Sequence, residues 1–257
     1  PATAIGQTRT VLVVDAGRGL AESLRGAKIP PSQPSVVLLT SLMPENVLGL
    51  DDLLANAWIA GRREPIRLLG PVGVANLAQQ AEKTVGPGIA ARAKALGIDA
   101  PPLRYLPQVI EAGFEASFDG IRVRVGALPD GPIESLLYRF EADGRAAVVS
   151  GAGWAPDAIT RFATGAQLLV HEGAMVPTPE EAAELGLDED PASLEREARF
   201  YGSLKAAGGI ARRAGIETLV LVRLRPPPVY DVQITSVIDD QFDGTIAIAK
   251  DGDVFEP

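Results

Sequence analysis

Hydrophobic residues in the first hundred positions form short continuous runs that alternate with segments of helical spacing. The runs are rich in Val and Leu and end near Gly, Pro or Asp, which is typical of buried strands. We therefore predict strands over residues 11–15, 35–40 and 67–71. The spacing of Leu20 and Leu24 predicts a helix over 19–26, and two more helices are expected, from residue 47 through Trp58 and over 72–96, the last interrupted at Gly86-Pro87-Gly88.

The pattern changes after Gly113, where short strands joined by Asp119-Gly120 and Asp143-Gly144 turns predict an antiparallel meander up to Ser150. Helix and strand signals then alternate again. They predict a helix over 156–163, a strand over 167–170, a long polar helix over 178–208, and strands over 218–222 and 245–249. This order predicts an α/β (α+β) protein with sheets between outer helices, an α/β or αββα layered domain. No Ser/Gly-rich linker divides the chain, so a single domain over residues 1–257 is expected.

Charge and hydropathy exclude several classes of partner. The formal net charge is −9, so the summed field repels phosphate backbones and a nucleic-acid partner is not expected. No uncharged apolar run approaches the roughly 20 residues that a membrane-spanning helix needs. We therefore expect a soluble protein that does not span a membrane.

The supply of metal-binding side chains is unusually small. The chain has no cysteine and one histidine, His171, whereas catalytic zinc sites commonly use two or three histidines. The absence of cysteine suits either redox compartment, so a cytoplasmic or a periplasmic location fits. Pro1-Ala2-Thr3 begins no charged and then apolar leader, and no signal peptide is expected in this sequence.

Several motifs follow one another in the order in which a known superfamily has them. They are Leu12-Val13-Val14-Asp15-Ala16-Gly17, Val37-Leu38-Leu39-Thr40, Val148-Val149-Ser150-Gly151, Leu168-Leu169-Val170-His171-Glu172 and the segment 214–221. In this succession the chain resembles the metallo-β-lactamase superfamily, in its ribonuclease Z and arylsulfatase-like branch. The resemblance implies a four-layer αββα sandwich and, in that family, a hydrolase in which two metal ions activate water.

The resemblance fails at the residues that would bind the metals. The family's Thr-His-x-His-x-Asp-His motif falls on residues 40–46, and its further ligands fall downstream. In this chain the seven ligand positions hold Ser41, Met43, Glu45, Asn46, Asp130, Ala152 and Arg223. An additional histidine of ribonuclease Z-like chains falls at Gly202. Because Arg cannot coordinate a metal and Ser, Met and Ala do not favour zinc, we predict no metal and no other cofactor.

If the fold holds, the resemblance implies that these seven positions still surround one pocket. Glu45 and Asp130 are then candidate general acid and base, and Arg223 is a candidate clamp for a carboxylate or an oxyanion. The alternative is that Arg223 forms an ion pair with Glu45 or Asp130 and fills the space of the metals. Ser41, Met43, Asn46 and Ala152 complete the pocket.

Two further residues have both a structural and a chemical interpretation. His171 follows an apolar strand and is either a hydrogen-bonded structural histidine or a general acid or base. Asp15 is interpreted as a carboxylate that stabilises a turn. A third arrangement, a hard-cation site of Asp15, Glu45, Asn46 and Asp130, uses oxygen ligands that suit magnesium, manganese or calcium.

Two functions of different class remain open from the sequence. One is a metal-independent hydrolase, lyase or isomerase that acts on a small organic substrate; the other is a non-catalytic pseudoenzyme that binds a ligand or a partner, with a homodimer as one form. An open pocket with an unpaired carboxylate favours the enzyme, and a closed, ion-paired cleft favours the pseudoenzyme. The family also has a strand before the position of Pro1, so we expect an uncovered or partner-paired sheet edge there.

Overall fold

The computed structural model describes residues 2–7, 10–129, 133–151, 153, 155–174, 179–184, 186, 190, 192–193, 196, 200–202, 204–225, 238 and 242–257. The chain forms two compact units. The first consists of Pro1–Glu111 with Lys250–Val254, and the second of Ala112–Ala249 with Phe255–Pro257. The single domain expected over 1–257 stays a prediction, and each unit is described by itself below.

The first unit is built on a five-stranded sheet in the order β1-β2-β3-β4-β5. Its strands are β1 (Thr3–Gln7), β2 (Thr10–Val14), β3 (Pro34–Leu38), β4 (Ile66–Gly70) and β5 (Tyr105–Val109). Strands β2 to β5 are parallel to their neighbours, and β1 pairs antiparallel with β2. All five residues of β2 are buried, as the continuous apolar run predicted.

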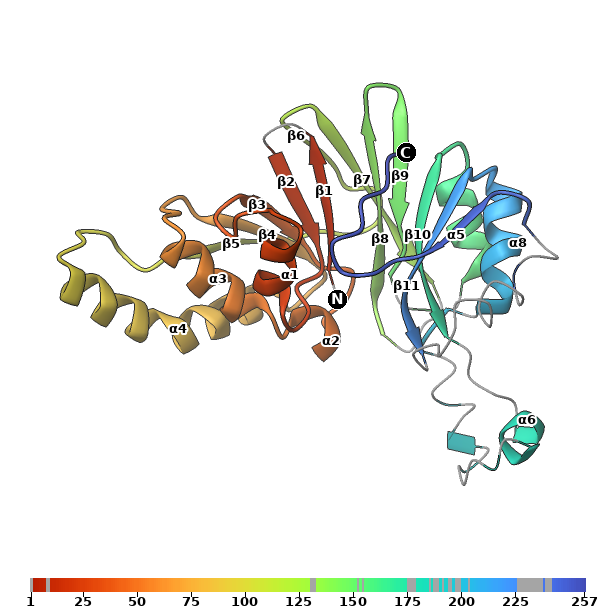
Figure 1. The fold of residues 1–257 in the computed structure, drawn as a ribbon, viewed down its shortest axis with the longest axis horizontal. Coiled ribbons are helices and arrows are strands. Elements are labelled where there is room, and N and C mark those ends of the chain that lie inside the picture. The colour runs from red at the N-terminus through yellow and green to blue at the C-terminus, as the bar shows by residue number, and fades with distance from the viewer. Residues whose placement is uncertain are drawn as a thin grey trace. The chain divides into compact units, whose positions relative to one another are not determined.

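Helices cover one face of this sheet, as Figure 1 shows for α1, α3 and α4. They are α1 (Leu20–Gly26), α2 (Pro44–Val47), α3 (Leu50–Ile59) and α4 (Val74–Leu96). Leu24, Leu53 and Trp58 are among the buried residues that pack them against the strands. Gly49, just before α3, lets the backbone there lie close to the segment after β2, because a Cβ at Gly49 would stand 2.2 Å from the carbonyl oxygen of Gly17.

Helix α4 corrects the predicted interruption at Gly86-Pro87-Gly88. It runs without a break from Val74 to Leu96 with Pro87 inside it. Pro87 lies on the exposed side of the helix, where water can replace the hydrogen bond that proline removes. Ile89 and Ala93 are buried beyond it, so packing of the second half against the core outweighs the local cost.

Two strands of the first unit were missed from the sequence, and both are sheet edges. β1 is too short and too rich in small residues to give an apolar run, and β5 exposes four of its five residues. Edge strand β5 is protected against pairing with other chains, since Pro107 lacks an N–H and the Tyr105 N–H donates to Glu82. β1 forms the other edge. The expected uncovered or partner-paired state of that edge stays a prediction.

The second unit contains a seven-stranded sheet in the order β12-β11-β10-β9-β8-β7-β6. Its strands are β6 (Glu115–Phe118), β7 (Ile121–Leu128), β8 (Ser135–Ala142), β9 (Arg145–Val149), β10 (Leu168–Ala174), β11 (Thr218–Arg225) and β12 (Thr245–Ile248). β6 to β9 form the predicted antiparallel meander, and β9 to β12 are parallel. Both predicted turns have positive φ, with Asp119 at 48° and Asp143 at 50°, each followed by a glycine of positive φ.

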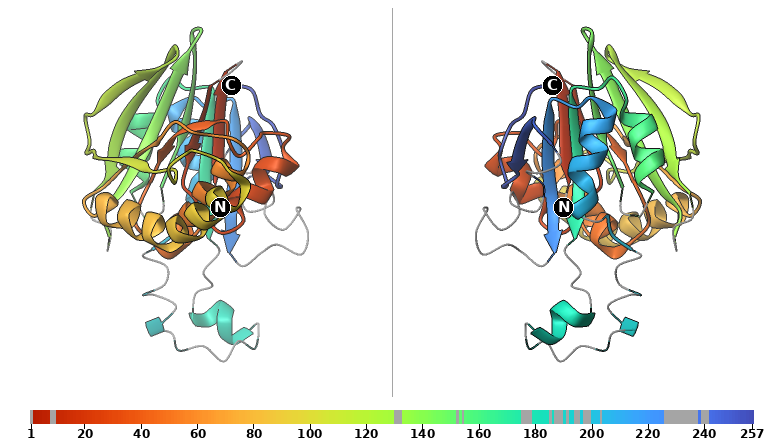
Figure 2. Two further views of the ribbon diagram at one scale, coloured as in Figure 1. Left: turned by 90° about the vertical axis from the view of Figure 1, so that its left-hand side faces the viewer. Right: turned by 90° about the vertical axis from the view of Figure 1, so that its right-hand side faces the viewer.

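Two helices, α5 (Pro156–Ala163) and α8 (Leu204–Ala214), cover one face of this sheet. Figure 2 shows them side by side. A third, α6 (Pro179–Glu184), lies between β10 and α8 in the chain. The long polar helix predicted over 178–208 is therefore wrong: Gly186 has a left-handed φ of 67° and residues 200–202 are not helical. No helix in the described ranges is long and apolar enough to cross a bilayer.

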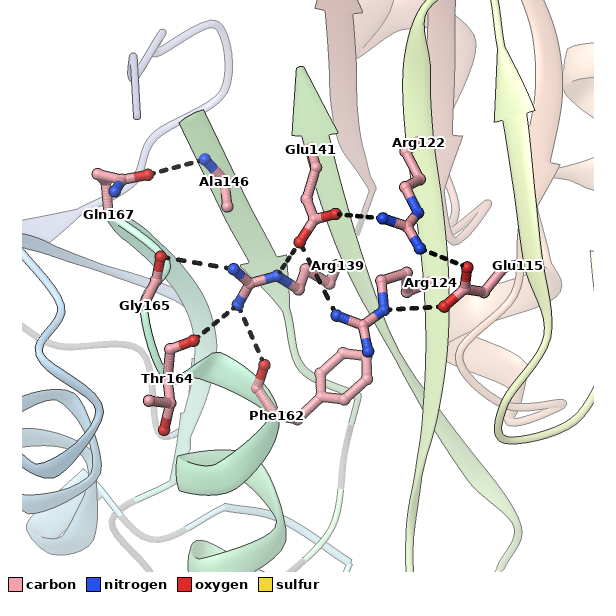
Figure 3. Close-up of polar contacts among 10 residues, drawn as sticks. All are labelled: Glu115, Arg122, Arg124, Arg139, Glu141, Ala146, Phe162, Thr164, Gly165 and Gln167. Atoms are coloured by element: carbon pink, nitrogen blue, oxygen red, sulfur yellow. Dashed lines mark hydrogen bonds and ion pairs between the residues drawn. The ribbon is translucent and has the colours of Figure 1, made fainter. Parts of the chain in front are cut away.

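Next to α5, the same face of the sheet has a network of arginine and glutamate side chains (Figure 3). Arg139 lies at its centre. Its Nε donates to Glu141 at 2.6 Å, and its other nitrogens donate to the carbonyl oxygens of Phe162, Thr164 and Gly165. The guanidinium thus donates hydrogen bonds to carbonyl groups at the C-terminal end of α5. Its positive charge there also interacts favourably with the helix dipole.

Replacing Arg139 by methionine keeps its aliphatic stem and removes all of these donors. Because the side chain is only 11% exposed, we expect the free energy of unfolding in urea to fall. The loss should be about 2 kcal/mol. The same change at Arg122, which is 55% exposed, should have a clearly smaller effect. Equal effects of the two variants would contradict the role given to Arg139.

Candidate functional site

Chemistry-bearing side chains gather where parallel strands end, the usual place for a site in sheets of this kind. In the first unit, Asp15 follows β2 and Thr40 and Ser41 follow β3 closely. In the second unit, Ser150 follows β9, and His171 and Glu172 lie near the end of β10. Arg223 lies near the end of β11. The two sets belong to different units and are taken in turn.

Asp15 ties the end of β2 to the segment that follows β3. Its backbone is left-handed, with φ 63°, which a non-glycine residue adopts only when its surroundings require it. The carboxylate accepts hydrogen bonds from the Thr40 N–H at 2.8 Å and from the Thr40 hydroxyl at 2.9 Å. Both residues are buried. The carboxylate thus fixes the start of the segment on which the family's ligand motif falls.

Asn46 closes this segment on itself. Its amide nitrogen donates to the Thr40 hydroxyl at 2.9 Å and to the Ser41 hydroxyl at 2.8 Å. Its backbone carbonyl accepts from the Ala16 N–H at 2.7 Å. Ser41 also accepts from the Met43 N–H, and the side chains of both Ser41 and Asn46 are buried completely. We call Asp15, Thr40, Ser41 and Asn46 the β3 network.

The other two residues of the predicted pocket in this unit are less enclosed. Met43 immediately precedes α2, and Glu45 lies in the first turn of that short helix. Neither is fully buried. Glu45 therefore lies next to the β3 network in the chain without being enclosed to the same degree.

In the second unit Arg223 forms an ion pair with Glu172, at 2.5 Å between Nη1 and Oε1. The two side chains are 7% and 5% exposed. Arg223 has a left-handed φ of 54°, and the register of β10 and β11 shifts between Glu172 and Ala174. A buried ion pair thus coincides with an irregularity in the sheet.

His171, the one histidine of the chain, lies beside this pair in β10. Its Nδ1 is 2.7 Å from the hydroxyl oxygen of Ser150, and its side chain is buried. On the other side of the ring, a Cβ at Gly202 would stand 3.0 Å from Nε2. Burial lowers the pKa of His171 from 6.5 to about 4, so the imidazole is neutral near pH 7.

Some of the predicted site residues cannot be placed. Asp130 and Ala152 lie outside the described residues. The predicted contact of Arg223 with Glu45 or Asp130 stays a prediction, because Glu45 belongs to the first unit. The sequence analysis missed Glu172 and Ser150 as partners of Arg223 and His171, although both stand inside the quoted motifs.

Comparison with known proteins identifies the relatives of the chain. No family profile matches it. Ribonuclease Z of Mycobacterium bovis (strain BCG / Pasteur 1173P2) is 26% identical over 262 residues, which cover 98% of this chain and 89% of that protein. Ribonuclease Z of Mycobacterium sp. (strain KMS) is 28% identical over 232 residues, 88% of this chain and 78% of that protein.

Solved structures show the same fold over nearly the whole chain. The metallo-β-lactamase fold protein YhfI from Bacillus subtilis superposes with a TM-score of 0.75 at 17% identity, covering 99% of this chain and 91% of that one. The short form of human tRNase Z superposes with a TM-score of 0.67 at 15% identity, covering 100% and 92%. The chain has the metallo-β-lactamase fold, and its sequence is similar to ribonuclease Z. The predicted fold class and superfamily are confirmed.

The described residues of this metallo-β-lactamase-fold protein do not suit the metals of its superfamily. No three His, Cys, Asp or Glu side chains in the described ranges lie together so as to hold a metal ion. Ser41 and Asn46 are engaged in the β3 network, and Arg223 brings a positive charge to a ligand position. Neutral oxygens and a guanidinium are poor zinc ligands, so the donor set does not fit.

The β3 network gives a prediction for Asn46. Asn46→Ala removes two hydrogen bonds and leaves buried hydroxyls short of a donor, so the free energy of unfolding should fall by about 2–4 kcal/mol. Asn46→Asp should cost more at pH 7, because it buries a second carboxylate close to Asp15. Urea denaturation followed by circular dichroism measures both. Asn76→Ala, on the exposed side of α4, is the control and should stay within about 0.5 kcal/mol.

His171 makes stability depend on pH in one direction. The unfolded chain binds a proton on this histidine below about pH 6.5, whereas the native protein binds it only near pH 4. The histidine therefore leaves stability unchanged above pH 6.5 and lowers it as the pH falls from 6.5 towards 4. Between pH 7 and pH 5 the loss should be about 2 kcal/mol.

The measurement compares wild type with His171→Asn in urea at both pH values, because other groups contribute equally to the two proteins. Only the wild type should lose the additional free energy of unfolding between pH 7 and pH 5. The single histidine also gives one set of imidazole signals in the NMR spectrum, which should stay those of the neutral ring at pH 5.5. A charged ring at that pH would refute the assignment.

Proposed function

We propose that this protein is a metal-free, non-catalytic member of the metallo-β-lactamase fold, which acts by binding a ligand or a partner. The observation that carries the proposal is the β3 network. The segment that bears the ligand motif in the family is closed here by its own hydrogen bonds, and Ser41 and Asn46 are fully buried. The Ser41 hydroxyl and the Asn46 amide nitrogen are engaged in these bonds, and neither side chain is exposed to a substrate.

The second unit supports the same conclusion. A hydrolytic site needs a charged or polar group that can reach a substrate, and it commonly holds one with a pKa near the working pH. Arg223 and Glu172 neutralise each other in a buried pair, and His171 is enclosed with a pKa of about 4. Each of the three is bound in an interaction that stabilises the fold.

The names of the relatives suggest RNA as a substrate, and we propose that this chain neither binds nor cleaves it. Its net charge of −9 opposes the approach of a polyanion. Its described residues offer no donor set that suits a metal ion for activating water. A small-molecule ligand or a second copy of the chain is the proposed partner in place of RNA.

A second candidate function rests on one contact, the 2.7 Å between the Ser150 hydroxyl and His171. A serine activated by a neutral imidazole is the core of a metal-independent hydrolase. Burial argues against it, since both side chains lie under other atoms of the unit and the lowered pKa makes His171 a weak base. If the protein proves to be catalytic, Ser150 and His171 are the residues that we propose for the reaction.

Both candidates are tested with untreated, purified protein. We expect less than about 0.1 equivalent of zinc, iron or manganese per chain by plasma mass spectrometry, because the donor set does not fit these ions. We also expect no hydrolysis of RNA, bis(p-nitrophenyl) phosphate or p-nitrophenyl acetate, with or without added Zn²⁺ or Mn²⁺. Ribonuclease Z of Mycobacterium bovis serves as the positive control for RNA.

Two results would decide against the proposal. Stoichiometric transition metal in the purified protein would reject the metal-free state. Ester hydrolysis that is lost in Ser150→Ala, and kept in Ser193→Ala as a matched exposed serine, would establish the second candidate instead.

A further inference from the structure

We propose that Arg223 is a built-in cation: its guanidinium neutralises the buried carboxylate of Glu172 and holds the ends of β10 and β11 together. The position is one at which the resemblance places a histidine ligand of the metals. The inference concerns the stability of the second unit and goes beyond the proposed function. It holds or fails whether or not the protein is catalytic, because its test measures unfolding and not turnover.

The first argument is electrostatic. A carboxylate that is 5% exposed has a large desolvation cost unless a positive charge or several donors face it. Arg223, itself 7% exposed, supplies that charge from the neighbouring strand. His171 is next to Glu172 in the chain but stays neutral, with its Nδ1 directed to Ser150. Arg223 is thus a cation on β11 that faces the Glu172 carboxylate.

The second argument comes from the backbone. Apart from Asp15, the other non-glycine residues of positive φ in the described chain follow a helix end or lie in a tight turn: Lys28, Asp119 and Asp143. Arg223 has φ 54° inside β11, opposite the point where the register of β10 and β11 shifts. A left-handed residue in a strand costs free energy and persists only when its surroundings hold it. The ion pair is an interaction that stabilises this conformation.

The third argument is that the chain around the pair is closely packed. A Cβ at Gly173 would stand 2.9 Å from Cδ1 of Leu204 and 3.0 Å from Cδ2 of Leu224. A Cβ at Gly202 would stand 3.0 Å from the carbonyl oxygen of Glu172. The chain segments next to the pair are thus packed closely.

The experiment is a double-mutant cycle on the thermal unfolding midpoint, with Glu172→Met, Arg223→Met and the double variant. Each single change removes one charge of the pair and leaves the other buried without it, so each should lower the midpoint by roughly 10 °C. The double change removes both charges and keeps a similar volume, so its midpoint should return to within about 3 °C of wild type. The strained backbone at residue 223 is present in both proteins that carry the Arg223→Met change, and its effect cancels in the cycle.

Two outcomes overturn the proposal. One is a double variant whose loss equals the sum of the two single losses. The other is an Arg223→Met protein as stable as wild type. If Arg223→Met does not fold, Glu172→Met in the same chain must restore folded protein, and failure to do so also counts against the pair.

Chemical rescue separates a missing cation from a missing contact. Arg223→Gly tolerates the left-handed backbone and leaves room for a small guanidinium ion. Methylguanidinium chloride at about 20 mM should raise its midpoint by several degrees relative to equal sodium chloride, because the ion can pair with Glu172. It should not raise the midpoint of wild type or of Glu172→Met with Arg223→Gly. An equal response of all three proteins would refute the cation role.

Discussion

Polar side chains at the ends of parallel strands are the constraint on which the rest of this structure depends. A strand that is buried on both faces ends inside or at the rim of the protein, and the carboxylates and amides there must find partners. In the first unit the segment after β3 supplies the partners, because its Thr40 donates to Asp15 at the end of β2 and accepts from Asn46. In the second they come from neighbouring strands, as Glu172 pairs with Arg223. In both units these side chains are engaged with one another.

The sequence resemblance places other residues at the metal-ligand positions of the family, and we propose that these polar contacts stabilise the fold in place of metals. A metal ion binds several strand ends at once and offsets their negative charge. In the first unit, hydrogen bonds among Asp15, Thr40 and Asn46 join two strand ends. In the second unit, we propose that a guanidinium offsets the negative charge. The side chains are then matched to one another, so restoring a single ligand would break an existing interaction before it created a new one.

The periphery is stabilised by side chains that serve more than one partner. Arg139 satisfies the carbonyls at the end of α5 while it pairs with Glu141, so one side chain joins a helix to the sheet. The open edge of β5 is protected by Pro107 and by Glu82, which keeps its backbone from pairing with another chain. α4 continues through Pro87 because Ile89 and Ala93 beyond it are buried. In each case a tertiary contact decides what local preference leaves open.

The sequence alone determined the class of fold and most of its elements, because continuous apolar runs and helical spacing report burial directly. It also placed the Asp119-Gly120 and Asp143-Gly144 turns, since few residues adopt their backbone geometry. It determined that one histidine and no cysteine are available. It did not reveal β1 and β5, whose residues are small or exposed, nor the continuity of α4 and the end of the helix predicted over 178–208. Only the tertiary structure decided which polar groups meet: Glu172 with Arg223, and Asn46 with Thr40 and Ser41. These pairings depend on the register between strands and on the path of a loop, which no local pattern of residues encodes.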